Sequence, residues 1–459
     1  MKPNTNTHDN IFSNLLKEVN PIDFYDYLQI DVELKQKHTV FAVVKNLLEI
    51  SKEKKWNLCT AFGDYVYLYN GSHWKQCDKK EMKDFLSEAA IKMGLPDYEA
   101  KSDNFPDKLL KQFLNNAYLK TKESPTDRVL INLLNGTFEI INGKENMKEF
   151  DPDDFITYQL PFKYNENASC PVWDKFLLRV VPDESCRKIL QEFVAFIFTT
   201  WNMEKCLFLL GEGQNGKSVF MDVLTALIGE EKMLQYPLGQ FNHEYSRAKL
   251  INVLVNCSSE KGTDLHPDTF KALVSMQAVQ AREIYQKPFT LYNKAKFIIN
   301  GNTLPKETEN TDAYFRRFLI IPFEIKITEE ERDIDLAKKI IASELPGVFN
   351  WMLKGLERLT VQQQFTKSEK AEKTLFEFRR QSDNVQLFLD EYPHHKTKPQ
   401  KSLTDIYEKY KTFCKDDGYK AKGKNNFSKE LEKKGYEKIR TKGGMYFGIQ
   451  FFQRREMAL

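Results

Sequence analysis

The chain has 459 residues, of which 41% are hydrophobic and 29% are charged, and this composition is typical of a globular protein rather than a disordered or fibrous one. Its length predicts two to four domains. No apolar run approaches the ~18 residues that a bilayer span requires, so we expect no membrane partner. The seven scattered cysteines form no CxxC pair, and the first residues carry no apolar signal segment. Together these features predict a reduced, cytoplasmic protein.

Helices and short strands mix in the first 165 residues. Residues 65–76 and 129–144 alternate apolar and polar side chains around Asn-Gly pairs, which are a strong signal for β-hairpins. The pairs are Asn70-Gly71, Asn135-Gly136 and Asn142-Gly143. We therefore expect an α+β scaffold here, followed by a helical segment at residues 173–198.

The centre of the chain, residues 201–325, alternates short apolar runs with helical stretches. The apolar runs lie at residues 206–210, 251–257, 296–300 and 318–323. Runs of this length, bounded by polar or glycine-containing turns, are typical of strands covered on both faces. Strands that alternate with helices predict an α/β sheet.

The most informative motif is GEGQNGKS, which matches the phosphate-binding pattern GxxxxGK[ST] between a predicted strand and a predicted helix. Its residues are Gly211, Glu212, Gly213, Gln214, Asn215, Gly216, Lys217 and Ser218. Glycines let backbone N–H groups close around phosphates, and a helix N-terminus adds positive potential there. Lys217 can reach the β- and γ-phosphates of ATP, and Ser218 can hold Mg²⁺. The alternative is a glycine turn that binds no nucleotide.

A phosphate site of this kind needs a second acidic group to orient Mg²⁺ or polarise water. Glu260 follows the predicted strand INVLVNC, where a carboxylate can point toward the glycine-rich loop. We therefore expect Ser218 and Glu260 to hold the metal ion. A lone acid after a strand can also be an ordinary surface residue.

The C-terminal segment is strongly basic. Residues 391–459 contain 17 Lys and Arg against 9 Asp and Glu, although the whole chain carries a net charge of only +3. Apolar spacing predicts three helices and then two strands around Lys442-Gly443-Gly444, an order typical of a winged helix. Lys424, Ser428, Lys429 and Lys433 should face outward from the third helix, and Lys438, Arg440 and Lys442 should lie in the wing. These lysines and the arginine predict contact with duplex DNA; the alternative is a small helical lid with a solvated surface.

Taken together, the chain resembles the superfamily 3 helicases of the D5 or phage/plasmid primase-helicase type, found in viruses and bacterial mobile elements. The resemblance runs from about residue 65 to residue 449. It is carried by LINLLNGTFEI, by residues 150–164 and QEFVAFIF, and most specifically by GEGQNGKS, KFIINGNTLP and DAYFRRFLIIPF. It implies an AAA+-like P-loop ATPase core, in which GEGQNGKS is the Walker A motif and Glu260 the Walker B acid.

The same resemblance assigns further catalytic roles. Asn302 falls on the sensor position, where its side chain would hold the attacking water. Arg317 is the expected arginine finger, which a neighbouring subunit inserts to offset charge on the transferred phosphoryl group. Arg316 is then a structural ion-pair partner, or the two roles are reversed. A finger that acts between subunits implies a ring, and the family ring is a homo-hexamer.

The resemblance also implies that residues 281–297 form the hairpin that grips single-stranded DNA in the ring pore. Lys287 and Phe289 would lie near its tip, with Arg282 ahead of it; charge would follow the backbone and the ring would contact bases. Without the family, an ordinary edge hairpin is the simpler interpretation. The chain departs from the family at Met276-Gln277, where Gly-Asp is usual, and at Ser259, where a second acid is common.

These observations predict five segments. They are a D5-type α+β domain (1–165), a helical collar (166–200), the ATPase core (201–325), a helical lid and linker (326–383) and a winged-helix domain (384–459). We expect an ATP- and Mg²⁺-dependent hexameric DNA helicase with 3′→5′ polarity, and a replication initiator of a phage or mobile element in the cytoplasm of a bacterial host. One alternative is a nucleotide-gated, origin-binding initiator that does not unwind DNA. Another is a P-loop enzyme that acts on small molecules, such as a kinase.

Overall fold

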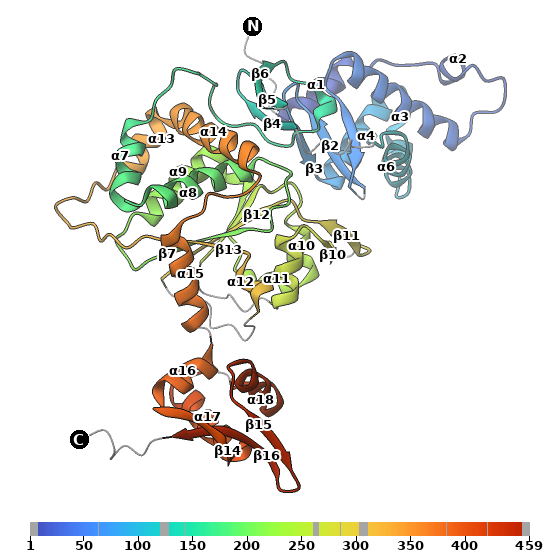
Figure 1. Cartoon of the computed structure of the whole chain (residues 1–459). Helices are drawn as coiled ribbons and strands as arrows, with labels where there is room; N and C mark the ends of the chain where they lie inside the picture. Colours follow the sequence, from blue (N-terminus) through green and yellow to red (C-terminus); the bar gives the residue numbers. More distant parts are fainter. Residues whose placement is uncertain are drawn as a thin grey trace.

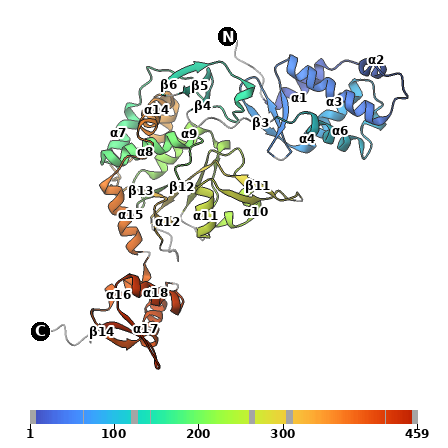
Figure 2. The same ribbon diagram turned by 45° about the vertical axis from the view of Figure 1, so that its right-hand side comes forward.

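The computed structural model describes residues 8–62, 64–119, 128–141, 143–259, 266–284, 286–302, 311–381, 383–419 and 421–451. It is a mixed α/β fold with a central parallel sheet (Figure 1). The N-terminal helices and strands lie to one side of this sheet, and the C-terminal helices and strands lie beyond a single connecting helix (Figures 1 and 2). None of the helices in these ranges is long and apolar enough to cross a membrane.

In the N-terminal part, helices pack on a three-stranded antiparallel sheet. The predicted hairpin around Asn70-Gly71 is confirmed: β2 and β3 pair antiparallel, and Gly71 adopts the positive φ of 92° that such a tight turn favours. The apolar faces of the longer helices form a core of their own with strands β1 to β3. The elements are η1 (His8–Asn10), α1 (Ile11–Glu18), α2 (Phe24–Leu28), α3 (Gln36–Glu53), β1 (Leu58–Ala61), β2 (Tyr65–Tyr69), β3 (Trp74–Cys77), α4 (Lys79–Lys92), α5 (Asp97–Ala100) and α6 (Phe105–Asn116).

A second antiparallel sheet follows, with strands β4 (Arg128–Leu133), β5 (Gly136–Ile141) and β6 (Lys144–Lys148) and then the short helix η2 (Pro152–Asp154). The hairpin predicted at Asn135-Gly136 is confirmed, and Asn142 lies outside the described residues. The inner residues of this sheet share one hydrophobic cluster with the following helices and the central sheet. The packing is therefore continuous across residue 165, and the domain boundaries stay a prediction.

The central sheet has five parallel strands in the order β13-β7-β12-β9-β8. Both of its faces are buried, as predicted, because alternate residues of β7 join different cores: Leu207 and Leu209 face one cluster, and Cys206 and Phe208 face the other. Strand β9 is shorter than predicted and begins at Val255. The strands are β7 (Cys206–Leu210), β8 (Met233–Leu234), β9 (Val255–Ser259), β12 (Lys296–Gly301) and β13 (Phe318–Pro322).

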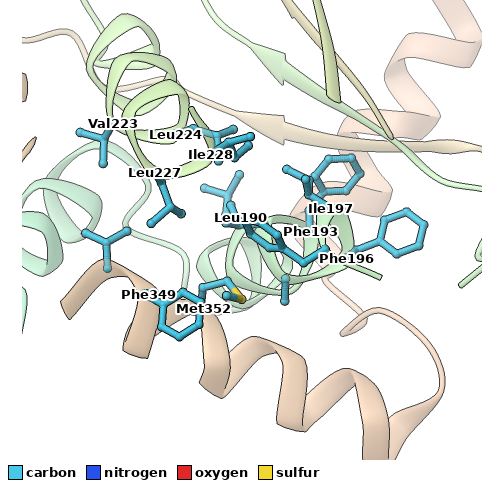
Figure 3. Packing of buried hydrophobic residues seen from close by; sticks show 14 of the residues in the cluster. Leu190, Phe193, Phe196, Ile197, Val223, Leu224, Leu227, Ile228, Phe349 and Met352 are labelled. Atoms are coloured by element: carbon cyan, nitrogen blue, oxygen red, sulfur yellow. The ribbon is translucent and has the colours of Figure 1, made fainter. Parts of the chain in front are cut away.

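Helices cover one face of this sheet and hold the predicted phosphate loop in place. Figure 3 shows Leu190 and Phe193 of α8 beside Leu224 and Leu227 of α9 and Phe349 of α14. Each such buried side chain stabilises the fold by about 1.5–3 kcal/mol. These helices are α7 (Pro171–Val180), α8 (Glu184–Ile197), α9 (Lys217–Ile228), α13 (Leu336–Ser343) and α14 (Leu345–Gln362).

The opposite face carries short helices and a two-stranded hairpin that pack in the second core cluster. The aromatic rings of Phe270 and Phe318 stack there with centroids 5.2 Å apart, which fixes the start of β13 against α11. The elements on this side are η4 (Leu238–Asn242), α10 (Glu244–Ala248), α11 (Pro267–Val274), β10 (Ala278–Ala281), β11 (Phe289–Tyr292) and α12 (Asp312–Phe315), and the short helix η3 (Glu230–Lys232) connects α9 to β8.

Helix α15 (Glu369–Gln381) leads from the core to the C-terminal module, which we define as residues 384–451 (Figure 1). The module contains α16 (Asn384–Glu391), β14 (His394–Ser402), α17 (Leu403–Asp416), α18 (Lys424–Lys433), β15 (Lys438–Thr441) and β16 (Gly444–Phe451), with its sheet in the order β14-β16-β15. The three helices and the final hairpin match the prediction, whereas β14 was not predicted. Ser428 is buried at 2% exposure rather than facing outward, because it lies one helical turn from the core residue Leu431.

Candidate nucleotide site and nucleic-acid surfaces

The predicted phosphate loop connects β7 to α9 at the carboxyl end of the central sheet, and two of its glycines are required by close packing. A Cβ at Gly211 would lie 2.3 Å from the carbonyl oxygen of Phe323, and one at Gly216 would lie 2.7 Å from Val180. Gly216 also has a φ of 86° and precedes the first residue of α9. Only glycine fits either position without moving the backbone.

Asn215 fixes the shape of the loop. Its side chain is 4% exposed and donates a hydrogen bond of 2.9 Å to the carbonyl oxygen of Phe323 at the end of β13. The backbone N–H of Ile327 donates to the carbonyl oxygen of Gln214 at 2.8 Å. The loop is thus tied to the next strand and the segment after it, so its backbone N–H groups are held before any ligand arrives.

Lys217 lies inside the loop. It is 8% exposed, and its ammonium donates to the carbonyl oxygen of Glu212 at 3.1 Å, to Asn215 Oδ1 at 3.3 Å and to the carbonyl oxygen of Gly211. Ser218 is exposed in the first turn of α9. A buried ammonium, a glycine-lined backbone and a helix N-terminus together form a site suited to a polyphosphate.

Strand β12, next to β7, brings the predicted sensor residue Asn302 to the same edge of the sheet. Strand β12 pairs with β7 on one side and β9 on the other, with Gly301 opposite Leu210 and Asn300 opposite Ser259. Asn302 therefore leaves the sheet beside Gly211. Strand β9 ends at Ser259 on this edge, and the predicted Walker B acid, Glu260, lies outside the described residues.

The two adjacent arginines lie at the other end of the sheet, just before β13, and their environments differ. Arg317 is 5% exposed; its guanidinium donates to Ser275 Oγ at 2.8 Å and pairs with Glu204 at 3.2 Å. The side chain of Arg316 is 63% exposed and pairs with Glu204 at 3.0 Å. This burial favours a structural role for Arg317, which is the alternative in which the roles of the two arginines are reversed. Of the two, Arg316 has the accessible side chain.

The predicted pore hairpin is an antiparallel pair, β10 and β11, with Ala281 opposite Phe289. Lys287 is exposed in the connecting loop, as a DNA contact requires. Phe289 is half-buried, and its ring meets that of Tyr65 from the N-terminal sheet with centroids 6.3 Å apart. This packing does not support Phe289 as a base contact.

Arg282 is also held within the protein. It forms an ion pair of 3.3 Å with Glu244 and lies 5.7 Å from the centre of the Tyr245 ring. Tyr292 on β11 is 65% exposed, which the sequence did not indicate. Its position four residues before a buried apolar run gave no signal that distinguishes it from a core tyrosine.

The predicted DNA-contacting side chains of the C-terminal module divide into two groups. Lys424 donates to Thr404 at 2.9 Å, Lys433 pairs with Glu430 at 2.8 Å, and Lys438 pairs with Glu432 at 2.6 Å. The other three are exposed on α18 and the β15–β16 hairpin. They are Lys429, Arg440 and Lys442. Among the residues that the structure describes, the side chains of this second group form no ion pair, so they are available to contact phosphate.

Three segments of the chain match three different protein families. Residues 45–182 match the family described as D5 N terminal like, residues 209–317 match a family of unknown function (DUF5906), and residues 380–455 match the family described as Poxvirus D5 protein-like. The central match spans the phosphate loop and both arginines, and the last match covers the C-terminal module.

Two viral proteins are similar in sequence. The putative helicase L207/L206 of Acanthamoeba polyphaga mimivirus is 23% identical over 292 residues, which is 56% of this chain and 30% of the relative. The putative helicase 121R of Invertebrate iridescent virus 3 is 25% identical over 227 residues, which is 44% of this chain and 24% of the relative. The matched segment thus spans less than a third of each curated relative. Among solved structures, the A form apo structure of the NrS-1 C-terminal region is 15% identical with a TM-score of 0.49, covering 88% of this chain and 98% of that one.

Proposed function

Because the chain is a D5-type member of the superfamily 3 helicases, we propose that it is an ATP-driven DNA helicase that works as a homo-hexameric ring with 3′→5′ polarity. In this proposal it serves replication of a phage or other mobile genome in the host cytoplasm. The observation that carries the proposal is the phosphate loop at the carboxyl edge of the parallel sheet, with Lys217 buried inside it.

The residues at this edge fit a magnesium-bound ATP. Gly211 and Gly216 present backbone without side chains, and a Ser218 hydroxyl with a Glu260 carboxylate would supply the oxygen ligands that Mg²⁺ prefers. The metal ion supplies neutralisation of phosphate charge. Lys217 would bind the terminal phosphates, and the Asn302 amide would orient the attacking water.

We propose Arg316 as the arginine finger. Strand β13 has five residues, Phe318–Pro322, and runs from the arginines to the edge that carries the phosphate loop. At about 3.3 Å per residue, this strand separates Arg316 from its own loop by roughly 17 Å. The arginine can therefore serve only the nucleotide of a neighbouring subunit, which is why the proposal includes a ring. Arg317 would position Arg316 through their shared partner Glu204.

Two surfaces would contact DNA. Lys287, exposed at the loop of the β10–β11 hairpin, would follow the backbone of a single strand in the ring pore. In the C-terminal module, the order of helices and strands and the β15–β16 hairpin support a winged helix, with α18 in the major groove and Arg440 and Lys442 on phosphates.

Substitution of Lys217 tests the proposal. ATP hydrolysis by the full chain, with single-stranded DNA present, should fall to background in Lys217→Ala, and duplex binding should be retained because the C-terminal module is untouched. Lys338→Ala is the matched control, since that side chain is 82% exposed on α13. Hydrolysis at the wild-type rate in Lys217→Ala would rule out the assigned site.

A second candidate has support from the hairpin, where Arg282 and Phe289 are both held by contacts within the chain. In that case the protein is a nucleotide-gated, origin-binding initiator that does not translocate. An assay with forked DNA separates the two: strand separation that requires ATP and is lost in Lys287→Ala supports the helicase. Tight duplex binding and hydrolysis without strand separation support the initiator.

A further inference from the structure

Strand β14 carries the highest net positive charge of the elements in the C-terminal module, and no sequence motif predicted it. Its nine residues, HHKTKPQKS, include three lysines and no acidic residue. It forms one edge of the three-stranded sheet, while β15 of the proposed wing forms the other. The two edges are separated by β16 alone, so their backbones lie about 10 Å apart.

The backbone of β14 is irregular where its lysines lie. Its pairing with β16 shifts between Lys396 and Lys401. Gly448 of β16 accommodates this bulge, because a Cβ there would lie 2.1 Å from the carbonyl oxygen of Thr397. Bulges bend a strand and redirect its side chains. Here Lys398 and Lys401 are both exposed.

A lysine outside the strand, Lys409 of α17, approaches β14 and is fixed in place. Its ammonium lies 4.2 Å from the centre of the Tyr392 ring and 4.3 Å from that of Phe451. Burial and then the nearby charge of Lys401 lower the pKa of Lys409. The fold therefore holds two like charges close together, which costs free energy unless an anion offsets it.

The acidic partners that balance other lysines of the module are missing here. Within residues 383–419 and 421–451, no ion-pair partner faces Lys398, Lys401 or Lys409. By contrast, Lys433 pairs with Glu430 and Lys438 pairs with Glu432. Lysines on a sheet edge also prevent strand pairing between molecules. That role accounts for Lys398 and Lys401 but not for Lys409, which belongs to a helix.

We propose that Lys398, Lys401 and Lys409 form a second phosphate-contact surface, which binds the backbone of duplex DNA at the sheet edge opposite the wing. We call it the β14 surface. The inference rests on the proposed function only in that it takes the C-terminal module to bind DNA. It adds that contact extends beyond α18 and the β15–β16 hairpin, so that the module holds a longer stretch of backbone and less of its affinity depends on sequence.

The test uses the full chain and a fluorescently labelled duplex, with binding measured by anisotropy over a series of salt concentrations. The double variant Lys398→Gln/Lys401→Gln should weaken binding about tenfold and reduce the slope of log affinity against log salt by about two, one for each lost phosphate contact. The matched control is Lys411→Gln/Lys415→Gln on α17, which removes the same charge from the same module. Lys411 is already paired with Glu408, so the control should change affinity by less than about twofold.

Each outcome decides the question. If the β14 variant and the control lose the same small amount of affinity while Arg440→Gln/Lys442→Gln weakens binding, the β14 surface is overturned and the winged-helix proposal stands. If the β14 variant self-associates in sedimentation with unchanged DNA affinity, the lysines only protect the sheet edge. If the wild-type chain does not bind duplex at all, the β14 surface and the duplex contact in the proposed function both fail. Thermal unfolding at the wild-type temperature shows that the variant is folded.

Discussion

The phosphate loop and the C-terminal module both present positive charge to phosphates, but they do so in opposite ways. The loop uses one buried ammonium, held by three acceptors of its own backbone and side chains. The module uses exposed lysines on several elements, some of them without an acidic partner in the described residues.

The difference follows from what each surface must do. A reaction needs one phosphate at one position, so the loop must be rigid and its packed residues are required. Binding to a backbone needs many contacts of similar strength, so no single lysine is decisive. A substitution at a packed position of the loop should therefore abolish ATP hydrolysis. Each substitution in the module should weaken DNA binding by a small amount, and these amounts should add.

The largest effect should come from Gly211→Ala. Its new Cβ would lie 2.3 Å from the carbonyl oxygen of Phe323. The loop must then move away from β13, and its backbone N–H groups no longer surround the phosphates. We expect ATP hydrolysis to fall by more than about 100-fold. Gly213→Ala is the control, because nothing lies within 4 Å of a Cβ there. Equal losses in the two variants would show that the loop tolerates displacement and that the contrast with the module is false.

The two arginines offer an effect of comparable size. Arg316→Ala should abolish hydrolysis and leave the unfolding temperature nearly unchanged, because its side chain is exposed. Arg317→Ala should lower the free energy of unfolding by about 1–3 kcal/mol, because it leaves Ser275 Oγ and the carbonyl oxygen of Ala313 without their donor, while Glu204 keeps Arg316 as a partner.

Mixed rings then test whether Arg316 acts between subunits. Subunits carrying Arg316→Ala and subunits carrying Lys217→Ala should regain part of the hydrolysis rate when combined, since each supplies what the other lacks at their shared boundary. No recovery, with normal assembly of the mixture, would count against a finger supplied by a neighbour.

A fall in pH should lower the stability of the N-terminal part more than that of the C-terminal module. Burial, and after it the nearby charges of His8, Lys232 and Lys75, lower the pKa of His73 to about 3. Because this value is below the unfolded one of about 6.5, the unfolded chain binds more protons between these limits. The contribution of His73 to stability is therefore complete above pH 6.5 and is lost as the pH falls toward 3.

Between pH 6.5 and pH 5 this loss should reach about 2 kcal/mol. Chemical denaturation followed at several pH values measures it, and His73→Gln should flatten the dependence. If the stability of that variant depends on pH as in the wild type, a residue other than His73 causes the acid sensitivity. His8 is then the next residue to substitute, since burial lowers its pKa as well.

The sequence was informative wherever local chemistry determines structure. Asn-Gly turns, the apolar strands of the parallel sheet and the loop before Lys217 could all be predicted, because each depends on a few adjacent residues. Strand β14 could not, since it lacks apolar alternation and contains Pro399; it is a strand because its backbone pairs with β16.

Long-range contacts also escaped prediction. Phe289 is packed because Tyr65, from a different sheet, meets its ring. The burial of Arg317 depends on Ser275 and Glu204, which lie far from it in the chain. A sequence does not distinguish a buried aromatic residue near a lysine from an exposed one. The same is true of a pair of adjacent arginines.

The smallest effects should come from single lysines of the C-terminal module, and they test whether its contacts are additive. Lys442→Gln should weaken duplex binding by about threefold, uniformly across DNA sequences, and reduce the salt slope by about one. Lys433→Gln should have less effect, because Glu430 already holds that ammonium at 2.8 Å and the glutamate left behind repels phosphate only weakly across solvent. Should either single substitution abolish binding, the module would contain one decisive contact, as the phosphate loop does, and the contrast between the two regions would no longer hold.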